Sequence, residues 1–171
     1  MSRLKPRADD GATFEIASRL RAQKGHRLDV SDRHLVLPTR ARQEGGDDRR
    51  PSALIADDQE IFRRAARQLL VQAGFAVVAE AHDGQDAVRL AASVSPSLVM
   101  LDIWMPGLDG IGAARLIRAR RPDAVIILVT ARHLDDLPIR AIEADVDTIV
   151  SKADLTPQLI RDLWERSRGL T

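Results

Sequence analysis

Four polar features follow apolar runs of this sequence: an acidic pair, a single aspartate, a threonine and a lysine. They are Asp57-Asp58, Asp102, Thr130 and Lys152. Three carboxylates held together repel one another, and a hard cation such as Mg²⁺, which prefers oxygen ligands, relieves that repulsion. A carboxylate that attacks a phosphoryl donor needs the donor's charge offset, which the cation and Lys152 would do, while Thr130 could donate its hydroxyl. The set has a nucleophile and electrophilic stabilisers but no evident base, so it predicts aspartyl phosphorylation rather than carbon chemistry.

Each of these features also has a plainer interpretation. An acidic pair such as Asp57-Asp58 can simply favour the N-terminus of a following helix. A lysine at a strand end is usually solvated. Here only Lys5, Lys24 and Lys152 among 26 basic residues are lysine, so a lysine where a compact ammonium is wanted carries more information.

The apolar runs that precede these residues alternate with stretches of helical periodicity. The predicted strands are 53–56, 76–79, 98–101, 125–129 and 148–150. One-face helical spacing links Ile61, Phe62, Ala65, Ala66, Leu69 and Leu70; Ala87, Val88, Leu90 and Ala91; Ile111, Ala114 and Ile117; Ile139, Ile142 and Ala144; and Leu159, Ile160, Leu163 and Trp164. The alternation predicts an α/β fold, a doubly wound sheet of five parallel strands with helices on both faces. The four polar features would then meet at the carboxyl ends of the strands.

Local signals place the ends of the last two helices. The weak fourth helix should begin near Pro138, a favourable residue for a first turn. The last helix should begin at Thr156-Pro157, a hydroxyl cap followed by proline, and should run to about Arg168 with Gly169 as its stop.

Residues 1–50 differ in composition from the remainder of the 171-residue chain. They hold 12 basic against 8 acidic residues, whereas the whole chain has a net charge of +1. The polar, turn-rich stretch 45–51 indicates a linker. Upstream of it, 14–23 could form a short helix and 34–37 a short strand, neither with an evident partner. We therefore expect a basic, largely disordered arm over 1–50 and one domain over 51–171; a translation start downstream of the arm is an equal alternative.

Composition excludes several classes of protein. Hydrophobic residues make up 44% and charged residues 30%, which suits a globular domain. Cysteine is absent, so there is neither a disulfide framework nor a thiolate metal site, and a cytoplasmic location is expected. No apolar stretch approaches the ~20 residues that a membrane helix needs.

The strand-end residues resemble the receiver domain of bacterial two-component response regulators. The resemblance covers about 52–168 and is carried by Asp57-Asp58, the run Leu101-Asp102-Ile103-Trp104-Met105-Pro106-Gly107-Leu108-Asp109-Gly110, Val129-Thr130-Ala131 and Ser151-Lys152. The segments 79–84 and 151–157 are most similar to the NarL subgroup. The resemblance implies a flavodoxin-like sheet with strand order 2-1-3-4-5.

The same resemblance implies a role for each site residue. Asp102 would be the phosphoacceptor, and Asp58, Asp102 and the backbone carbonyl of Trp104 would hold Mg²⁺, with Asp57 acting through water. Thr130 and Lys152 would contact the phosphoryl group. The expected donor is a histidine kinase or a phosphotransfer protein, the target is a downstream protein, and a homodimer is compatible with the family.

Three departures from the family pattern qualify these expectations. The chain ends at Thr171, where NarL-type proteins usually continue into a helix-turn-helix, so we expect no direct DNA binding. Ile149 stands where an aromatic switch residue is usual. Ala153 replaces the proline that often follows the lysine, which puts the placement of Lys152 in question.

Two flanking side chains, Trp104 and Arg132, should border the phosphoryl group and obstruct water, which predicts slow self-dephosphorylation. Two other functions remain open on the residues. One is a receiver-like binding scaffold that is not phosphorylated. The other is a phosphatase of the haloacid dehalogenase type, although such enzymes carry Asp-x-Asp after the first strand and this chain has Asp57-Asp58-Gln59. The leading interpretation is a response regulator that catalyses only its own phosphorylation and dephosphorylation.

Overall fold

A computed structural model describes residues 29–31, 34–36 and 50–169. In chain order the elements are β1 (Asp29–Ser31), β2 (His34–Val36), β3 (Ser52–Ala56), α2 (Glu60–Gln72), β4 (Ala76–Ala81), α3 (Gly84–Val94), β5 (Leu98–Asp102), α4 (Gly110–Arg120), β6 (Val125–Thr130), the 3-10 helix η1 (Leu134–Asp136), α5 (Ile139–Ile142), β7 (Thr148–Ser151), the 3-10 helix η2 (Lys152–Asp154) and α6 (Pro157–Ser167). The predicted alternation of strands and helices from residue 52 onward is confirmed. The predicted helix at 14–23 and the linker at 45–49 lie outside the described residues.

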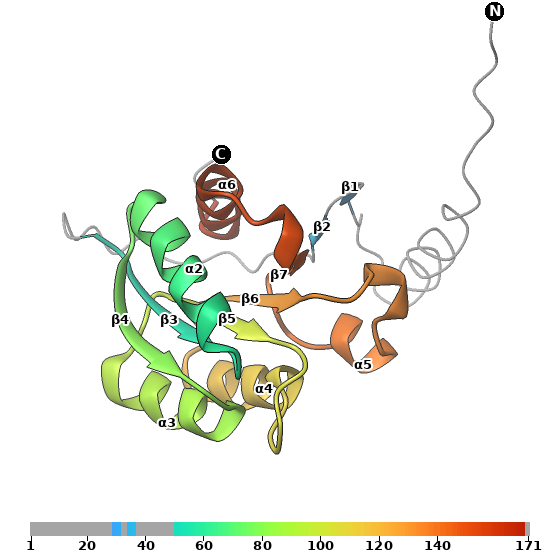
Figure 1. The fold of residues 1–171 in the computed structure, drawn as a ribbon, viewed down its shortest axis with the longest axis horizontal. Coiled ribbons are helices and arrows are strands. Elements are labelled where there is room, and N and C mark those ends of the chain that lie inside the picture. Colours follow the sequence, from blue (N-terminus) through green and yellow to red (C-terminus); the bar gives the residue numbers. More distant parts are fainter. Residues whose placement is uncertain (1–28, 32–33, 37–49, 170–171) are drawn as a thin grey trace, which may run out of the picture.

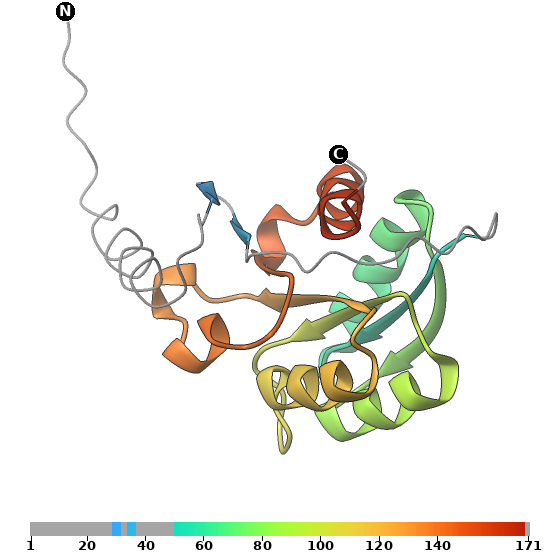
Figure 2. The same cartoon turned by 180° about the vertical axis from the view of Figure 1, so that it is seen from behind.

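The five predicted strands form a parallel sheet in the order β4-β3-β5-β6-β7, which is the expected 2-1-3-4-5 arrangement. Helices α2 and α6 lie on one face and α3 and α4 on the other (Figure 1). The view from behind shows α3 and α4 side by side (Figure 2). The central strands β5 and β6 are buried along their whole length, as expected for strands covered on both faces.

The sheet has more strands than predicted, because β1 and β2 extend it beyond β7. The sequence predicts a strand at 34–37, which is confirmed for 34–36. The expectation that this strand has no partner is wrong for the described residues. His34–Val36 pairs antiparallel with β7, with Leu35 opposite Ile149. An edge strand presents unpaired backbone groups, and any segment that reaches it can pair with it. The division of the chain into an arm and a domain stays a prediction.

The core consists of two apolar layers, one on each side of the sheet. The layer under α2 and α6 includes Phe75, whose ring meets that of Trp164 edge-on at 5.3 Å between centroids. The other layer contains Ile149, which is fully buried. Ile61, predicted on the buried face of α2, is instead 86% exposed, and Ala65, one turn later, is also exposed. Both lie outside the face that carries the buried Ala66 and Leu70.

Helix caps largely follow the sequence signals. The side chain of Thr156 accepts a hydrogen bond from Leu159 N at 3.1 Å, and Pro157 opens α6 as predicted. The fourth predicted helix is reduced to the four residues of α5. Pro138 precedes that helix as its extended cap instead of forming its first turn. Among the described residues, no helix is long and apolar enough to cross a bilayer.

Candidate functional site

The acidic pair lies where β3 ends and α2 begins. Asp57 N donates to Ala81 O at 3.2 Å, which holds the chain beside β4. Its carboxylate Oδ1 accepts from Gln59 N at 2.9 Å, so Asp57 caps the start of a helix whose own cap residue makes no side-chain bond. Asp57 is fully buried, whereas Asp58 is exposed.

Asp102 is the last residue of β5, and the following loop holds it in place. Ile103 N donates to Val129 O at 2.9 Å, which continues the pairing with β6 just beyond Asp102. Gly110 approaches so closely that a Cβ there would collide with the carbonyl oxygen of Asp102. A side chain at position 110 would therefore displace either the start of α4 or the end of β5, which explains this glycine.

Thr130 and Lys152 follow the next two strands along the sheet. Thr130 is fully buried at the end of β6, and its Oγ1 accepts from Arg132 N at 3.0 Å. Lys152 begins η2, where the Ser151 hydroxyl accepts from Ala153 N at 3.3 Å. The described residues contain no cis peptide bond. A serine-capped 3-10 turn thus sets the backbone of Lys152 where the family often uses a proline.

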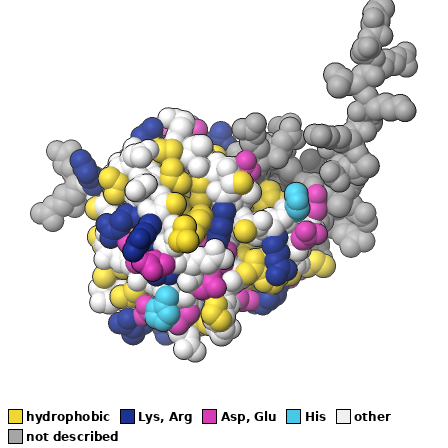
Figure 3. Space-filling model, in the orientation of Figure 1, with side chains coloured by type: hydrophobic (Ala, Val, Ile, Leu, Met, Phe, Trp, Pro, Cys, Tyr) yellow, Lys and Arg dark blue, Asp and Glu magenta, His cyan; other side chains and the backbone are white. Residues whose placement is uncertain are grey.

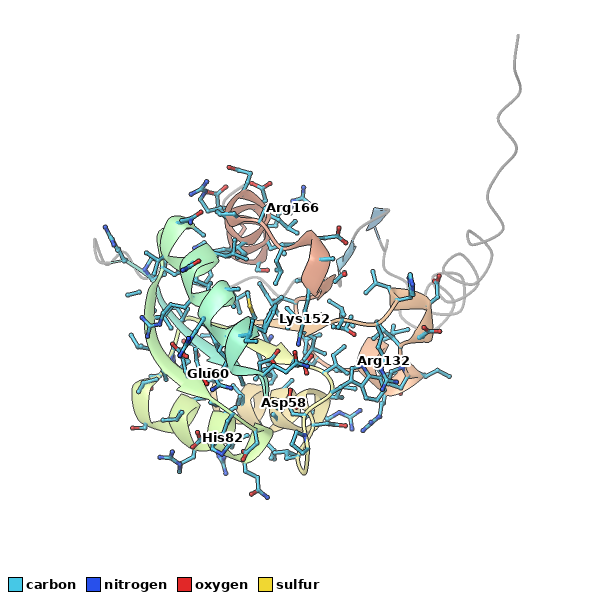
Figure 4. The ribbon with its side chains drawn as sticks, in the orientation of Figure 1. Asp58, Glu60, His82, Arg132, Lys152 and Arg166 are labelled. Carbon is cyan, nitrogen blue, oxygen red and sulfur yellow. The ribbon has the colours of Figure 1, made fainter. Side chains whose placement is uncertain are left out.

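These side chains converge at one edge of the sheet, as the sequence predicts. Lys152 Nζ lies 2.5 Å from Asp57 Oδ2 and 3.3 Å from Asp102 Oδ1. Carboxylate oxygens of Asp57, Asp58 and Asp102 all lie within 4.8 Å of one another. Figure 4 labels Asp58 and Lys152, which follow the ends of β3 and β7, at this edge of the sheet.

The cluster is short of positive charge, since three carboxylates share one ammonium. Burial is the largest influence on Asp102 and raises its pKa above the ordinary 3.8; Lys152 acts to lower the pKa, and Asp57 and Asp58 act to raise it. A cation between the three carboxylates would offset their repulsion, and carboxylate oxygens are the ligands that hard divalent cations prefer. The residues present therefore fit a divalent metal ion.

Trp104 and Arg132, which follow Asp102 and Thr130 by two residues each, form a stacked pair. The Arg132 guanidinium carbon lies 4.0 Å from the centroid of the indole ring. The indole Nε1 is buried and has no hydrogen-bond partner among the described residues. The sequence places both residues near the site but gives no sign that they contact each other. The role of the Trp104 carbonyl as a metal ligand stays a prediction.

Two residues at the site were missed by sequence reasoning, Phe62 and Arg63 of α2. Arg63 Nη1 donates to Asp57 O at 2.8 Å. The Phe62 ring centroid lies 4.3 Å from Lys152 Nζ. Periodicity assigned Phe62 to the core, but its ring also contacts the Lys152 ammonium. Its position in the first turn after the acidic pair was the signal that could have placed it at the site.

Comparison with known proteins identifies the family. A family model described as the response regulator receiver domain matches residues 53–163. The chain belongs to this family. The receiver match leaves the haloacid dehalogenase alternative without support. It also agrees with the sheet order and with the strand-end position of the polar residues.

Curated relatives of this receiver domain are bacterial response regulators. The transcriptional regulatory protein PdtaR of Mycobacterium tuberculosis (strain ATCC 25618 / H37Rv) is 39% identical over 110 residues, which are 62% of this chain and 53% of PdtaR. The response regulator GacA of Pseudomonas aeruginosa is 31% identical over 68% of this chain and 55% of its own length. The chemotaxis protein CheY of Bacillus subtilis is 39% identical over 58% of this chain and 82% of its own length. This chain spans about half the length of PdtaR and GacA.

Solved receiver domains share the fold. The signal receiver domain of NarL from Mycobacterium tuberculosis has a TM-score of 0.62 at 26% identity and covers 71% of this chain and 98% of its own. A LuxR-family response regulator from Aurantimonas has the same TM-score at 32% identity, over 70% of this chain and 86% of its own. The NarL-type resemblance in the sequence is thus reflected among the structural neighbours.

Proposed function

We propose that this receiver domain accepts a phosphoryl group on Asp102 with Mg²⁺ and signals by protein contact or by passing the group onward. The observation that carries the proposal is the position of Lys152 Nζ between Asp57 and Asp102, with three carboxylates inside 4.8 Å. Asp57, Asp58, Asp102 and the carbonyl of Trp104 would hold the metal. When bound, Mg²⁺ supplies positive charge that offsets the phosphoryl oxygens.

The chain's own residues account for the remaining chemistry. A carboxylate oxygen of Asp102 attacks phosphorus while the bond from phosphorus to the donor breaks, and the electron pair of that bond leaves with the donor. Lys152, already within 3.3 Å of Asp102, offsets charge on the new acyl phosphate. The Thr130 hydroxyl, whose oxygen accepts from Arg132 N, keeps its own proton to donate to a phosphoryl oxygen.

The family supports a proposal for the partners. The donor would be a histidine kinase or a phosphotransfer protein, and the target a downstream protein; direct DNA binding is not part of the proposal. A Borrelia burgdorferi CheX–CheY complex with BeF3 and Mg²⁺ has a TM-score of 0.60 and 25% identity to this chain, over 67% of this chain and 87% of its own. It supports Mg²⁺ and a protein partner here by analogy. The domain would catalyse only its own phosphorylation and dephosphorylation.

Intact-protein mass spectrometry with Mg²⁺ and acetyl phosphate tests this function. We expect the unsubstituted protein to gain one phosphoryl group and Asp102→Asn to gain none. Gain of the group by both proteins would move the acceptor to another residue. No gain by a folded, Mg²⁺-binding protein would favour the unphosphorylated scaffold, for which the buried aliphatic side chain of Ile149 is the supporting observation.

A further inference from the structure

The ammonium of Lys152 contacts both carboxylates and an aromatic ring. Two carboxylates, from Asp57 and Asp102, lie within 3.3 Å, and the ring centroid of Phe62 lies 4.3 Å away. The lysine side chain is only 12% exposed, so most of it has been removed from water. A cation within about 6 Å of an aromatic centroid is attracted to the ring, more strongly when it is desolvated. The ring therefore contributes to holding the ammonium, in addition to filling space.

We propose that Phe62 is a positioning residue that holds the Lys152 ammonium toward the carboxylates of Asp57 and Asp102. The consequence for phosphorylation rests on the function proposed above. A lysine stem has four flexible carbons, and the serine-capped turn at Ser151 fixes only its backbone. The ion pairs with Asp57 and Asp102 restrain the ammonium on one side, and the ring of Phe62 restrains it on another.

The ring is itself held on a rigid element. Phe62 is half-buried in the first turn of α2 and packs against the core layer between that helix and the sheet. The next residue, Arg63, ties this turn to the backbone carbonyl of Asp57 at 2.8 Å. Phe62 and Asp57 therefore keep a fixed relation, and Lys152 lies between them. A site built from restrained side chains on a helix keeps its geometry better than one built on loops alone.

Three variants separate the effect of the aromatic ring from the effect of side-chain volume. Phe62→Leu keeps an apolar side chain but removes the aromatic face, whereas Phe62→Tyr keeps that face. Phe75→Leu is the matched control, because Phe75 belongs to the same core layer but its ring contacts Trp164. A purely structural role for Phe62 would make the two leucine variants behave alike.

The contact can be measured without phosphorylation. The chain has three lysines, so carbon-13-labelled lysine gives few signals, and loss of one in Lys152→Arg assigns Lys152. We expect the ε-methylene of Lys152 to show a ring-current shift in the unsubstituted full chain, in Phe62→Tyr and in Phe75→Leu, and to lose it in Phe62→Leu. An unchanged signal in Phe62→Leu would overturn the proposal.

The second measurement is the rate of phosphorylation by acetyl phosphate at saturating Mg²⁺. We expect Phe62→Leu to be slower by roughly three- to tenfold, as loss of one cation–π contact implies, with recovery in Phe62→Tyr and no comparable loss in Phe75→Leu. Equal rates for the leucine and tyrosine variants would overturn the positioning role. If the unsubstituted protein takes no phosphoryl group, the proposed function fails, and the shift of the Lys152 signal alone decides whether Phe62 holds the lysine.

Discussion

Two groups of buried charged side chains lie at opposite ends of the parallel strands, and they are neutralised to different degrees. At the amino ends, Arg118 of α4 donates from Nη2 to Asp147 Oδ2 at 2.7 Å, and the same oxygen accepts from Ile126 N at 2.7 Å. The guanidinium also donates to three backbone carbonyls. These belong to Pro122, Ala124 and Asp145. One buried positive charge thus meets one buried negative charge, with hydrogen bonds around both, and the exposed carboxylate of Asp145 lies 4.0 Å from Arg118 Nε.

At the carboxyl ends the charges do not balance. The buried carboxylates of Asp57 and Asp102, with the exposed Asp58 beside them, face one ammonium, that of Lys152, and burial raises the pKa of Asp102. The balanced pair holds α4 and the strand starts together, whereas the unbalanced group is set up to receive a cation and a phosphoryl group. Excess buried charge is costly for stability, so its presence is a sign of function. The face drawn in Figure 3 offers no such contrast, because acidic, basic and apolar side chains are interspersed over it.

The largest effect on stability should come from the balanced pair. Arg118→Ala leaves Asp147 buried without its guanidinium, and we expect a loss of ~3–5 kcal/mol in the free energy of unfolding. Urea denaturation measures it. The matched control is Arg121→Ala, whose partner Asp123 is 67% exposed, and it should cost no more than about 1 kcal/mol. Similar losses in both variants would mean that burial of the Arg118 pair has no special weight.

Mg²⁺ should bind only at the unbalanced end of the strands, and its binding should stabilise the folded protein. At a free concentration 100-fold above the dissociation constant, we expect the unfolding free energy to rise by about 2.7 kcal/mol. Asp58→Ala should weaken this gain, because it removes an exposed ligand. Asp123→Ala removes an acidic residue at the other end of the strands, so this variant should keep the full gain in unfolding free energy. Urea denaturation with and without Mg²⁺ decides, and equal gains in the two variants would place the metal elsewhere.

The pH dependence of stability should show the excess charge directly. Folding raises the pKa of Asp102, so its favourable contribution is complete below the unfolded value near 3.8 and is lost as the pH rises through the folded value. Asp102→Asn does not titrate at this position. Without metal, the variant should therefore gain stability relative to the unsubstituted protein as the pH rises from 3.8 toward neutrality. Urea denaturation across this pH range measures the difference in unfolding free energy between Asp102→Asn and the unsubstituted protein, with Asp123→Asn as the control. A difference that stayed constant with pH would contradict a raised pKa of Asp102 in the folded protein.

The contrast also shows what the sequence alone can predict. The five parallel strands and the residues at their carboxyl ends could be predicted, because periodicity is local and parallel strands bring Asp57, Asp102 and Lys152 to one edge. Contacts that depend on tertiary packing could not. Arg118 looks like any helix arginine until β6 and β7 are placed beside it. The pairing of β2 with β7 likewise joins segments more than 100 residues apart, for which local pattern gives no signal.

The smallest effect should come from the pair that follows Asp102 and Thr130 in the sequence, in which Arg132 stacks on Trp104 at 4.0 Å. If this pair obstructs water, Arg132→Ala should shorten the half-life of the phosphorylated protein by roughly threefold, the scale of one exposed cation–π contact. Arg168→Ala is the matched control, because Arg168, the cap at the end of α6, makes a similar stack on Trp164. Loss of the phosphoryl mass over time measures both. A half-life that is equal in the two variants would show that the Arg132 stack only covers the surface and does not limit the access of water to Asp102.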